Sequence, residues 1–170
     1  KDIVRAFDVS LILYAEHSFN VSTFTARTIT SSLSDIHGAI TGAIASLKGP
    51  LHGGANEEVM HMMNKIKKPE HALKWINKAL DNKDVVMGFG HRVYKNGDSR
   101  VPTMREYFGK VAKIKKDKKF EKIYDIVEKV MIDRKNIHPN VDYPTGPTYH
   151  LMGFDTDFFT PIFVISRITG

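Results

Sequence analysis

Helical periodicity is the feature that most constrains the fold of this chain. Apolar residues recur every three or four positions across residues 72–80 and again across residues 120–131. That spacing gathers them on one face of a helix, so each stretch predicts an amphipathic helix. Only residues 85–87 have an extended character, and the segment is too short to seed a sheet. The sequence therefore predicts an all-α fold.

Small residues and prolines mark further helices and one break. Residues 36–47 carry glycine or serine at every fourth position, which lets a second helix approach closely. Thr160 and Pro161 open a last apolar segment, because proline is tolerated at a first helical position. Pro144 and Pro147 predict that the chain breaks just after Asp142.

Composition excludes several classes of function. The chain has 170 residues and no cysteine, which rules out disulfides, zinc–thiolate sites and cysteine nucleophiles. Its longest apolar stretch, residues 39–47, is too short to cross a bilayer, so no membrane partner is expected. The chain starts without methionine and stops inside an apolar pattern. We interpret it as an internal piece of a longer protein.

The net charge of +6 is concentrated in a lysine-rich run at residues 110–119. Such runs are typical of a solvated helix face or loop, with contact to a phosphate as the alternative. No nucleic-acid-binding motif accompanies the lysines, so nucleic acid is not an expected partner.

His52 stands on a glycine-rich bend, residues 49–56, directly before Glu57 and Glu58. Glycines followed by acidic residues are a helix-start signal, and the positive end of a helix dipole disfavours an imidazolium. A neutral His52 can donate a hydrogen bond to a developing oxyanion. Taken alone, such a histidine is more often a helix-cap residue.

Four more motifs accompany this bend along the chain. They are Glu-His-Ser-Phe-Asn-Val-Ser-Thr at 16–23, Gly-Phe-Gly-His-Arg-Val-Tyr at 88–94, Asp-Ser-Arg at 98–100 and Asn-Val-Asp at 140–142. Taken together in this order, the set resembles the citrate synthase family. The resemblance covers nearly all of the chain, and it also assigns residues 23–33 to a helix, although their β-branched residues favour a strand on propensity alone.

The resemblance implies a condensation of acetyl-CoA or propionyl-CoA with oxaloacetate, which gives citrate or 2-methylcitrate plus CoA. Such a reaction needs a base, a donor to the enolate oxygen and a donor to the ketone. By motif match, Asp142 is the base, His52 holds the enolate oxygen and His91 polarises the ketone. Citryl-CoA cleavage shares much of the same motif set.

Oxaloacetate is a dianion, and arginine grips carboxylates bidentately. The resemblance assigns Arg100, Arg167 and His17 to oxaloacetate, together with His91. Arg167 lies in an otherwise apolar run and therefore needs an anionic partner. Family members add an arginine from the other subunit of a homodimer, beyond the end of this chain.

The segment before His91 matches the family's loop against the adenine of CoA. The matched residues are Val86, Met87, Gly88, Phe89 and Gly90, and Lys95 stands where members often carry a cation near the CoA phosphates. The glycines do not form a dinucleotide fingerprint, because the third glycine is missing. The CoA thioester is a substrate, so no cofactor is expected. No metal is expected either, since the histidines and aspartates lack ligand spacing.

The resemblance divides the chain into helices of a large domain at 1–50, a small domain at 51–148 and returning helices at 149–170. Gly49 and Pro50, like the prolines at 144–147, lie near the expected crossings and suit a hinge that closes over substrate. The resemblance implies a cytoplasmic enzyme. The alternative is that these residues alone form a non-catalytic module that binds CoA or a partner subunit.

Residues 11–17, 22–27 and 143–149 look more like bacterial 2-methylcitrate synthases than mitochondrial citrate synthases. This similarity favours propionyl-CoA. Tyr143 and the prolines after it are expected to shape the space beside the reacting carbon.

Overall fold

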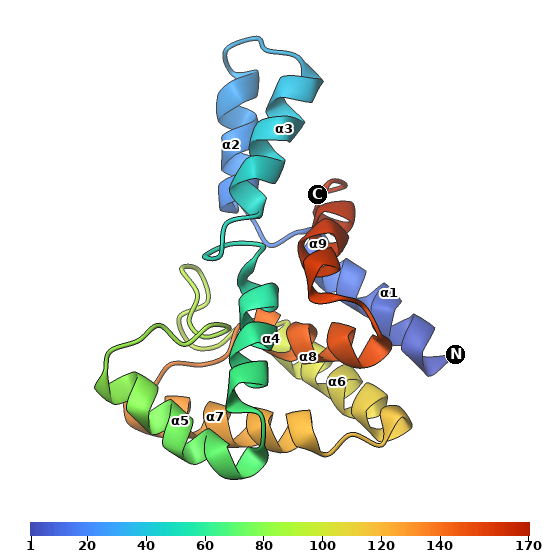
Figure 1. Ribbon diagram of the computed structural model, residues 1–170. Coiled ribbons are helices and arrows are strands. Elements are labelled where there is room, and N and C mark those ends of the chain that lie inside the picture. The colour runs from blue at the N-terminus through green and yellow to red at the C-terminus, as the bar shows by residue number, and fades with distance from the viewer.

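The computed structural model describes residues 1–170, which form nine α-helices, one short 3₁₀ helix and no strand (Figure 1). The helices are α1 (Asp2–Ala15), α2 (Val21–Thr30), α3 (Ile36–Leu47), α4 (Ala55–Ile66), α5 (Pro69–Asp81), α6 (Val101–Lys115), α7 (Lys119–Lys135), α8 (Asp142–Met152) and α9 (Phe159–Arg167), with η1 (Thr156–Phe158) before α9. The all-α prediction is confirmed. Residues 85–87 belong to no strand, and the only bridge joins Phe89 to Pro139.

The two amphipathic helices predicted from periodicity are α5 and α7, which pack against each other. Pro69 stands at the start of α5, and the apolar face of that helix is buried through Ala72, Ile76, Ala79 and Leu80. Helix α7 buries Phe120, Ile123, Tyr124, Val127 and Met131. Burial of these faces joins the two helices to the main core.

Helix α8 forms the centre of the molecule, between α4 and α6 (Figure 1). Every residue from 143 to 149 is buried. Gly146 is the point of closest approach to α4, because a Cβ atom there would lie 2.8 Å from the carbonyl oxygen of Asn56. The position of α8 therefore depends on the absence of a side chain at this residue.

The predicted break at Pro144 and Pro147 is wrong, since both prolines lie inside α8. Pro144 is in the first helical turn, where a backbone N–H has no acceptor within the helix and its loss costs nothing. Pro147 removes one hydrogen bond of the helix interior. Packing on all sides holds the helix in spite of that loss. The proline segment is therefore part of a helix and does not act as a linker. Helix α8 also runs through the division predicted between residues 148 and 149.

Helices α2 and α3 form a hairpin that projects from the rest of the chain (Figure 1). Asn20 caps α2, with its side-chain oxygen accepting from the Thr23 backbone N–H at 3.0 Å. Gly42 lets α3 approach Ile29 of α2, as the small-residue spacing predicts. Helix is thus confirmed over most of residues 23–33.

Helices α1 and α9 come from opposite ends of the chain and lie side by side (Figure 1). The lysine-rich run forms the exposed end of α6 and the turn before α7, as the solvated interpretation predicts. No helix is long and apolar enough to cross a membrane.

Two glycines that both lie within helices allow a matched test of this packing. We expect Gly146→Ala to lower the free energy of unfolding by about 1–3 kcal/mol, because the new methyl group overlaps the Asn56 carbonyl. Gly109→Ala in α6 should raise it by about 0.5–1 kcal/mol, since its methyl group meets only ordinary contacts at 3.6 Å or beyond. Urea unfolding of the two variants measures both changes. Equal effects at the two positions would contradict the close approach of α8 to α4.

Candidate active site

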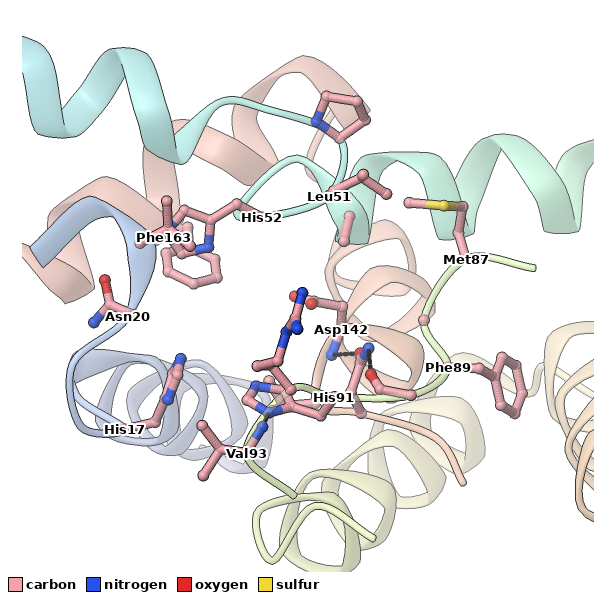
Figure 2. Close-up of a pocket in the computed structure, with 18 of the residues that line it drawn as sticks. His17, Asn20, Leu51, His52, Met87, Phe89, His91, Val93, Asp142 and Phe163 are labelled. Carbon is pink, nitrogen blue, oxygen red and sulfur yellow. Dashed lines mark hydrogen bonds between the residues drawn. The ribbon is translucent and has the colours of Figure 1, made fainter. Parts of the chain in front are cut away.

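One cleft of about 400 Å³ lies where the turn after α1, the bend before α4, the loop after α5 and the start of α8 meet (Figure 2). It gathers eleven of the twelve predicted site residues: His17, His52, Val86, Met87, Gly88, Phe89, Gly90, His91, Arg100, Asp142 and Arg167. The twelfth, Lys95, is exposed and does not line the cleft. The predicted convergence of His52, His91 and Asp142 is therefore met.

Asp142 is the first residue of α8 and is half-buried. The hydroxyl of Tyr14 donates to its Oδ1 at 2.5 Å. Burial raises the pKa of Asp142 to about 6, against the lowering effects of the Tyr14 hydrogen bond and of Arg100. The carboxylate is therefore ionised at neutral pH and is a stronger base than an ordinary aspartate.

His52 lies in the turn before α4 and faces the cleft (Figure 2). Its Nε2 accepts the backbone N–H of Ser22 at 3.2 Å and lies 3.0 Å from the Ser22 hydroxyl. Since Nε2 accepts, the single proton of a neutral ring is on Nδ1. Burial lowers the pKa of His52 to about 4, and Arg167 adds to this. The neutral state agrees with our expectation, and its causes include burial and a nearby cation.

His91 follows the glycine loop and is also held as a neutral donor. Its Nδ1 accepts the backbone N–H groups of Val93 at 3.0 Å and Tyr94 at 3.3 Å, which leaves the proton on Nε2. Burial and Arg100 lower the pKa of His91 below its usual value. The ring of His17 lies edge-on to it, with the centroids 5.0 Å apart.

His17 has a buried Nδ1 without a hydrogen-bond partner in the protein. Burial lowers the pKa of His17 to about 4, with Arg100 as the next cause. Three neutral imidazoles thus line a cleft that is also lined by three arginines, Arg92, Arg100 and Arg167. Hydrogen-bond donors and positive charge together favour an anionic ligand.

Arg167, at the end of α9, is buried and only partly satisfied. Its Nε donates to the backbone carbonyl of Tyr14 at 2.6 Å, and its guanidinium lies 4.7 Å from the ring centre of Phe163. Nη1 and Nη2 have no partner in the protein. Burial lowers the pKa of Arg167 to about 10, so the group still carries its charge at neutral pH. The protein supplies no anion to it, and a carboxylate in the cleft would satisfy both nitrogens.

Arg100 is held differently, by a bidentate ion pair with buried Asp98. Nε lies 2.9 Å from Oδ1 of Asp98, and Nη2 lies 2.8 Å from Oδ2. Asp98 also accepts the backbone N–H of Val141 at 3.0 Å. Asp98 therefore joins Arg100 to the segment that carries Asp142.

The glycine loop has the backbone freedom and the anchorage that a close ligand contact requires. Gly88 and Gly90 adopt φ values of 84° and 76°, which disfavour any side chain. Asn140 fixes the loop, donating from its backbone to Gly88 at 2.9 Å and from its side chain to Gly90 at 2.9 Å. The loop and the segment before Asp142 therefore form one rigid unit.

Tyr143 does not line the cleft, contrary to our expectation. It is fully buried, its hydroxyl donates to the Tyr124 carbonyl at 3.0 Å, and its ring packs behind Phe89. Because α8 turns this side chain toward the core, Tyr143 supports the cleft from behind. The apolar wall beside His52 consists of Leu51, Ala55 and Phe163.

Sequence reasoning missed the residues that hold the predicted ones in place: Tyr14, Ser22, Asp98 and the side chain of Asn140. Only Asp98 left a signal, because it stands two positions before Arg100. Ser22 gave none, because its contact with His52 joins segments 30 positions apart.

Comparisons with known proteins agree with this geometry. The model of the family described as "Citrate synthase, C-terminal domain" matches residues 1–170. The chain is 62% identical over 167 residues to 2-methylcitrate synthase 2 of Corynebacterium glutamicum and 56% identical over 168 residues to citrate synthase of Mycolicibacterium smegmatis. These alignments cover 98% and 99% of this chain but 44% and 45% of the relatives, so the chain spans less than half of their length.

A solved structure shows the same fold. It is a citrate synthase from Thermoplasma acidophilum in a ternary complex with carboxymethyl coenzyme A and oxaloacetate, with a TM-score of 0.92 and 38% identity. The match covers 100% of this chain and 46% of that one. With a family model that matches every residue and relatives of this identity, the chain belongs to the citrate synthase family.

Proposed function

We propose that the whole protein joins an acyl-CoA to oxaloacetate and releases CoA. The observation that carries the proposal is the shared cleft, which combines a carboxylate of raised pKa, neutral histidines and a buried arginine with two unpaired nitrogens. The relatives named citrate synthase and 2-methylcitrate synthase support it, as does the solved complex with a CoA analogue and oxaloacetate.

In the first step, Asp142 removes a proton from the carbon beside the thioester. The electron pair moves onto the thioester oxygen, which then bears the charge of an enolate. His52 donates its Nδ1 proton in a hydrogen bond to that oxygen. A neutral donor suits this role, because the proton is shared with the developing charge and the ring need not titrate.

In the second step, the enolate carbon attacks the ketone of oxaloacetate, and a carbon–carbon bond forms. His91 donates from Nε2 to the ketone oxygen, which becomes the hydroxyl of the product. Arg167, Arg100 and His17 hold the carboxylates of oxaloacetate. Water then cleaves the thioester of the condensed product, so one water molecule is consumed and free CoA leaves.

CoA would lie along residues 86–90, where the anchored glycine loop allows close approach. Lys95 is exposed near this loop and would meet the phosphates. The turn at Gly49 and Pro50 joins the α2–α3 hairpin to α4 and would act as a hinge between the large and small domains. Closure would exclude water from the enolate.

We also propose that the whole protein is a homodimer and that these 170 residues alone do not complete the site. The hairpin exposes apolar side chains, including Phe24 at 55% and Ile36 at 71%, which a partner subunit would cover. The alternative for these residues alone, a non-catalytic module that at most binds CoA or a subunit, predicts that the isolated 170-residue chain releases no CoA from an acyl-CoA and oxaloacetate.

The role of Asp142 can be tested by an isosteric change. In the whole protein, Asp142→Asn should lower the turnover number by roughly 10²–10⁴-fold, because the amide cannot accept the substrate proton. Oxaloacetate affinity should change much less, since the arginines remain. Steady-state kinetics and calorimetric binding measure the two effects. Asp84→Asn, at an exposed position, is the matched control. An unchanged turnover number in Asp142→Asn would remove Asp142 from its role.

The pH dependence follows from the pKa of the base. Asp142 acts as the carboxylate, so activity should be full above its pKa of about 6 and fall as the pH drops through that value. His52 has a pKa of about 4 and should stay neutral over the same range. We would measure kcat/KM for the acyl-CoA between pH 5 and 8. A profile that stays flat across pH 6 would contradict the assignment.

The acyl preference is expected to favour propionyl-CoA. One methylene changes discrimination by about 1–3 kcal/mol, so acetyl-CoA should react as well, at a specificity constant lower by roughly 10–200-fold. The two constants are measured on the whole protein with oxaloacetate fixed and the products identified by mass. A preference for acetyl-CoA would overturn the 2-methylcitrate assignment and leave the condensing mechanism intact.

A further inference from the structure

We propose that Tyr14 is a positioning residue of the active site, whose hydroxyl holds Oδ1 of Asp142 so that Oδ2 receives the substrate proton. Its backbone carbonyl holds Arg167 at the same time. The inference rests on the proposed function and adds to it the atom that acts as the base and the residue that aims it. No motif in the sequence points to this tyrosine.

The hydrogen bond between Tyr14 and Asp142 has a defined direction. An ionised carboxylate can only accept, so the phenol donates across the 2.5 Å to Oδ1. The side-chain nitrogen of Asn56 donates to the Tyr14 oxygen at 3.4 Å, which leaves the phenol proton free for Asp142. Burial raises the pKa of Tyr14 well above its usual value, so the phenol keeps this proton. Tyr14 itself is fully buried in the last turn of α1.

The second oxygen of Asp142 has no such partner. The Tyr14 hydroxyl is the only group that hydrogen-bonds to the Asp142 carboxylate. Asp142 is half-buried and lines the cleft, so its second oxygen is the one left for a ligand. A carboxylate tied at one oxygen loses its rotational freedom and presents the other in a fixed direction.

The backbone of Tyr14 connects the base to the anion-binding side of the cleft. Its carbonyl accepts from Nε of Arg167 at 2.6 Å, and its ring lies 4.1 Å from the ring of Phe163. Phe163 in turn stacks under the Arg167 guanidinium. One residue of α1 therefore contacts groups on both α8 and α9, the helices that carry Asp142 and Arg167.

Removal of the hydroxyl has a predictable electrostatic effect. A hydrogen-bond donor to the charged form of a carboxyl group lowers the pKa of that group. Loss of the Tyr14 hydroxyl therefore lets burial raise the pKa of Asp142 further. The other charged groups that face Asp142 are Arg100 and Asp98 ahead of α6 and Arg167 on α9. Tyr14→Phe keeps all of them, and it keeps the ring against Phe163 and the backbone carbonyl.

The test compares Tyr14→Phe with Tyr149→Phe in the whole protein. The acid limb of the pH–kcat/KM profile should move upward by about one to two pH units in Tyr14→Phe, the value of a lost hydrogen bond to a charged group. Oxaloacetate affinity should stay within about threefold, because the Arg167 contact is to the backbone. Tyr149 is also buried, but its hydroxyl pairs with Ser10 at 2.9 Å, so its removal should leave the limb in place. An unmoved limb in Tyr14→Phe, or an equal shift in both variants, would overturn the proposal.

A second variant serves if Tyr14→Phe folds poorly. Site-specific replacement of Tyr14 by 3,5-difluorotyrosine keeps the shape and makes the phenol a stronger donor. The acid limb should then move downward, opposite to the effect of phenylalanine. A limb that moves upward or stays in place with this residue would overturn the proposal.

A readout independent of turnover separates this proposal from the proposed function. Aspartate labelled with ¹³C at the carboxyl carbon gives one signal for Asp142, assigned by its loss in Asp142→Asn. The midpoint of its titration should rise in Tyr14→Phe and not in Tyr149→Phe. If the unmodified protein forms no condensation product, the proposed function fails whatever this signal does. If product forms and the midpoint is unmoved, the positioning role fails alone.

Discussion

Burial of ionisable side chains sets the protonation states of the base and of the neutral histidines in the cleft. The same removal from water raises the pKa of Asp142 to about 6 and lowers those of His17 and His52 to about 4. A carboxylate becomes a better base and imidazoles become neutral donors for one physical reason, because a low dielectric disfavours the charged form. Arg100 and Arg167 reinforce the neutrality of the histidines, since a second positive charge nearby is unfavourable. The chemistry proposed for the cleft depends on this shared environment.

Packing around α8 makes that burial possible. The helix begins at Asp142 and is buried from 143 to 149, with Gly146 against the backbone of α4. Polar groups at its start are held by partners from other segments, Tyr14 from α1 and Asp98 from the loop before α6. The cleft is thus assembled from residues far apart in the chain. A shift of α8 within the core would therefore move Asp142, the glycine loop at 88–90 and the Arg100–Asp98 ion pair together.

The sequence predicted the elements whose pattern is local. The apolar faces of α5 and α7 follow from periodicity, and the start of α4 follows from its glycines and acidic residues. Convergence of His52, His91 and Asp142 could not be predicted from spacing, and it was expected only because their motifs resemble one family. The predicted break at residues 144–147 was wrong, since a buried environment overrides the helix-breaking tendency of Pro147. Tyr14 and Ser22 act through contacts with distant segments, and such contacts leave no pattern in the sequence.

Proton exchange at the carbon beside the thioester tests the central claim most directly. The whole protein would be incubated in D₂O with propionyl-CoA and malate, which has a hydroxyl in place of the reactive ketone of oxaloacetate. Enolate formation without condensation then appears as deuterium in the acyl group, followed by NMR. The account predicts exchange in the unmodified protein and a rate at least about a hundredfold lower in Asp142→Asn. Exchange at the same rate in both proteins would contradict the assignment of Asp142 as the base.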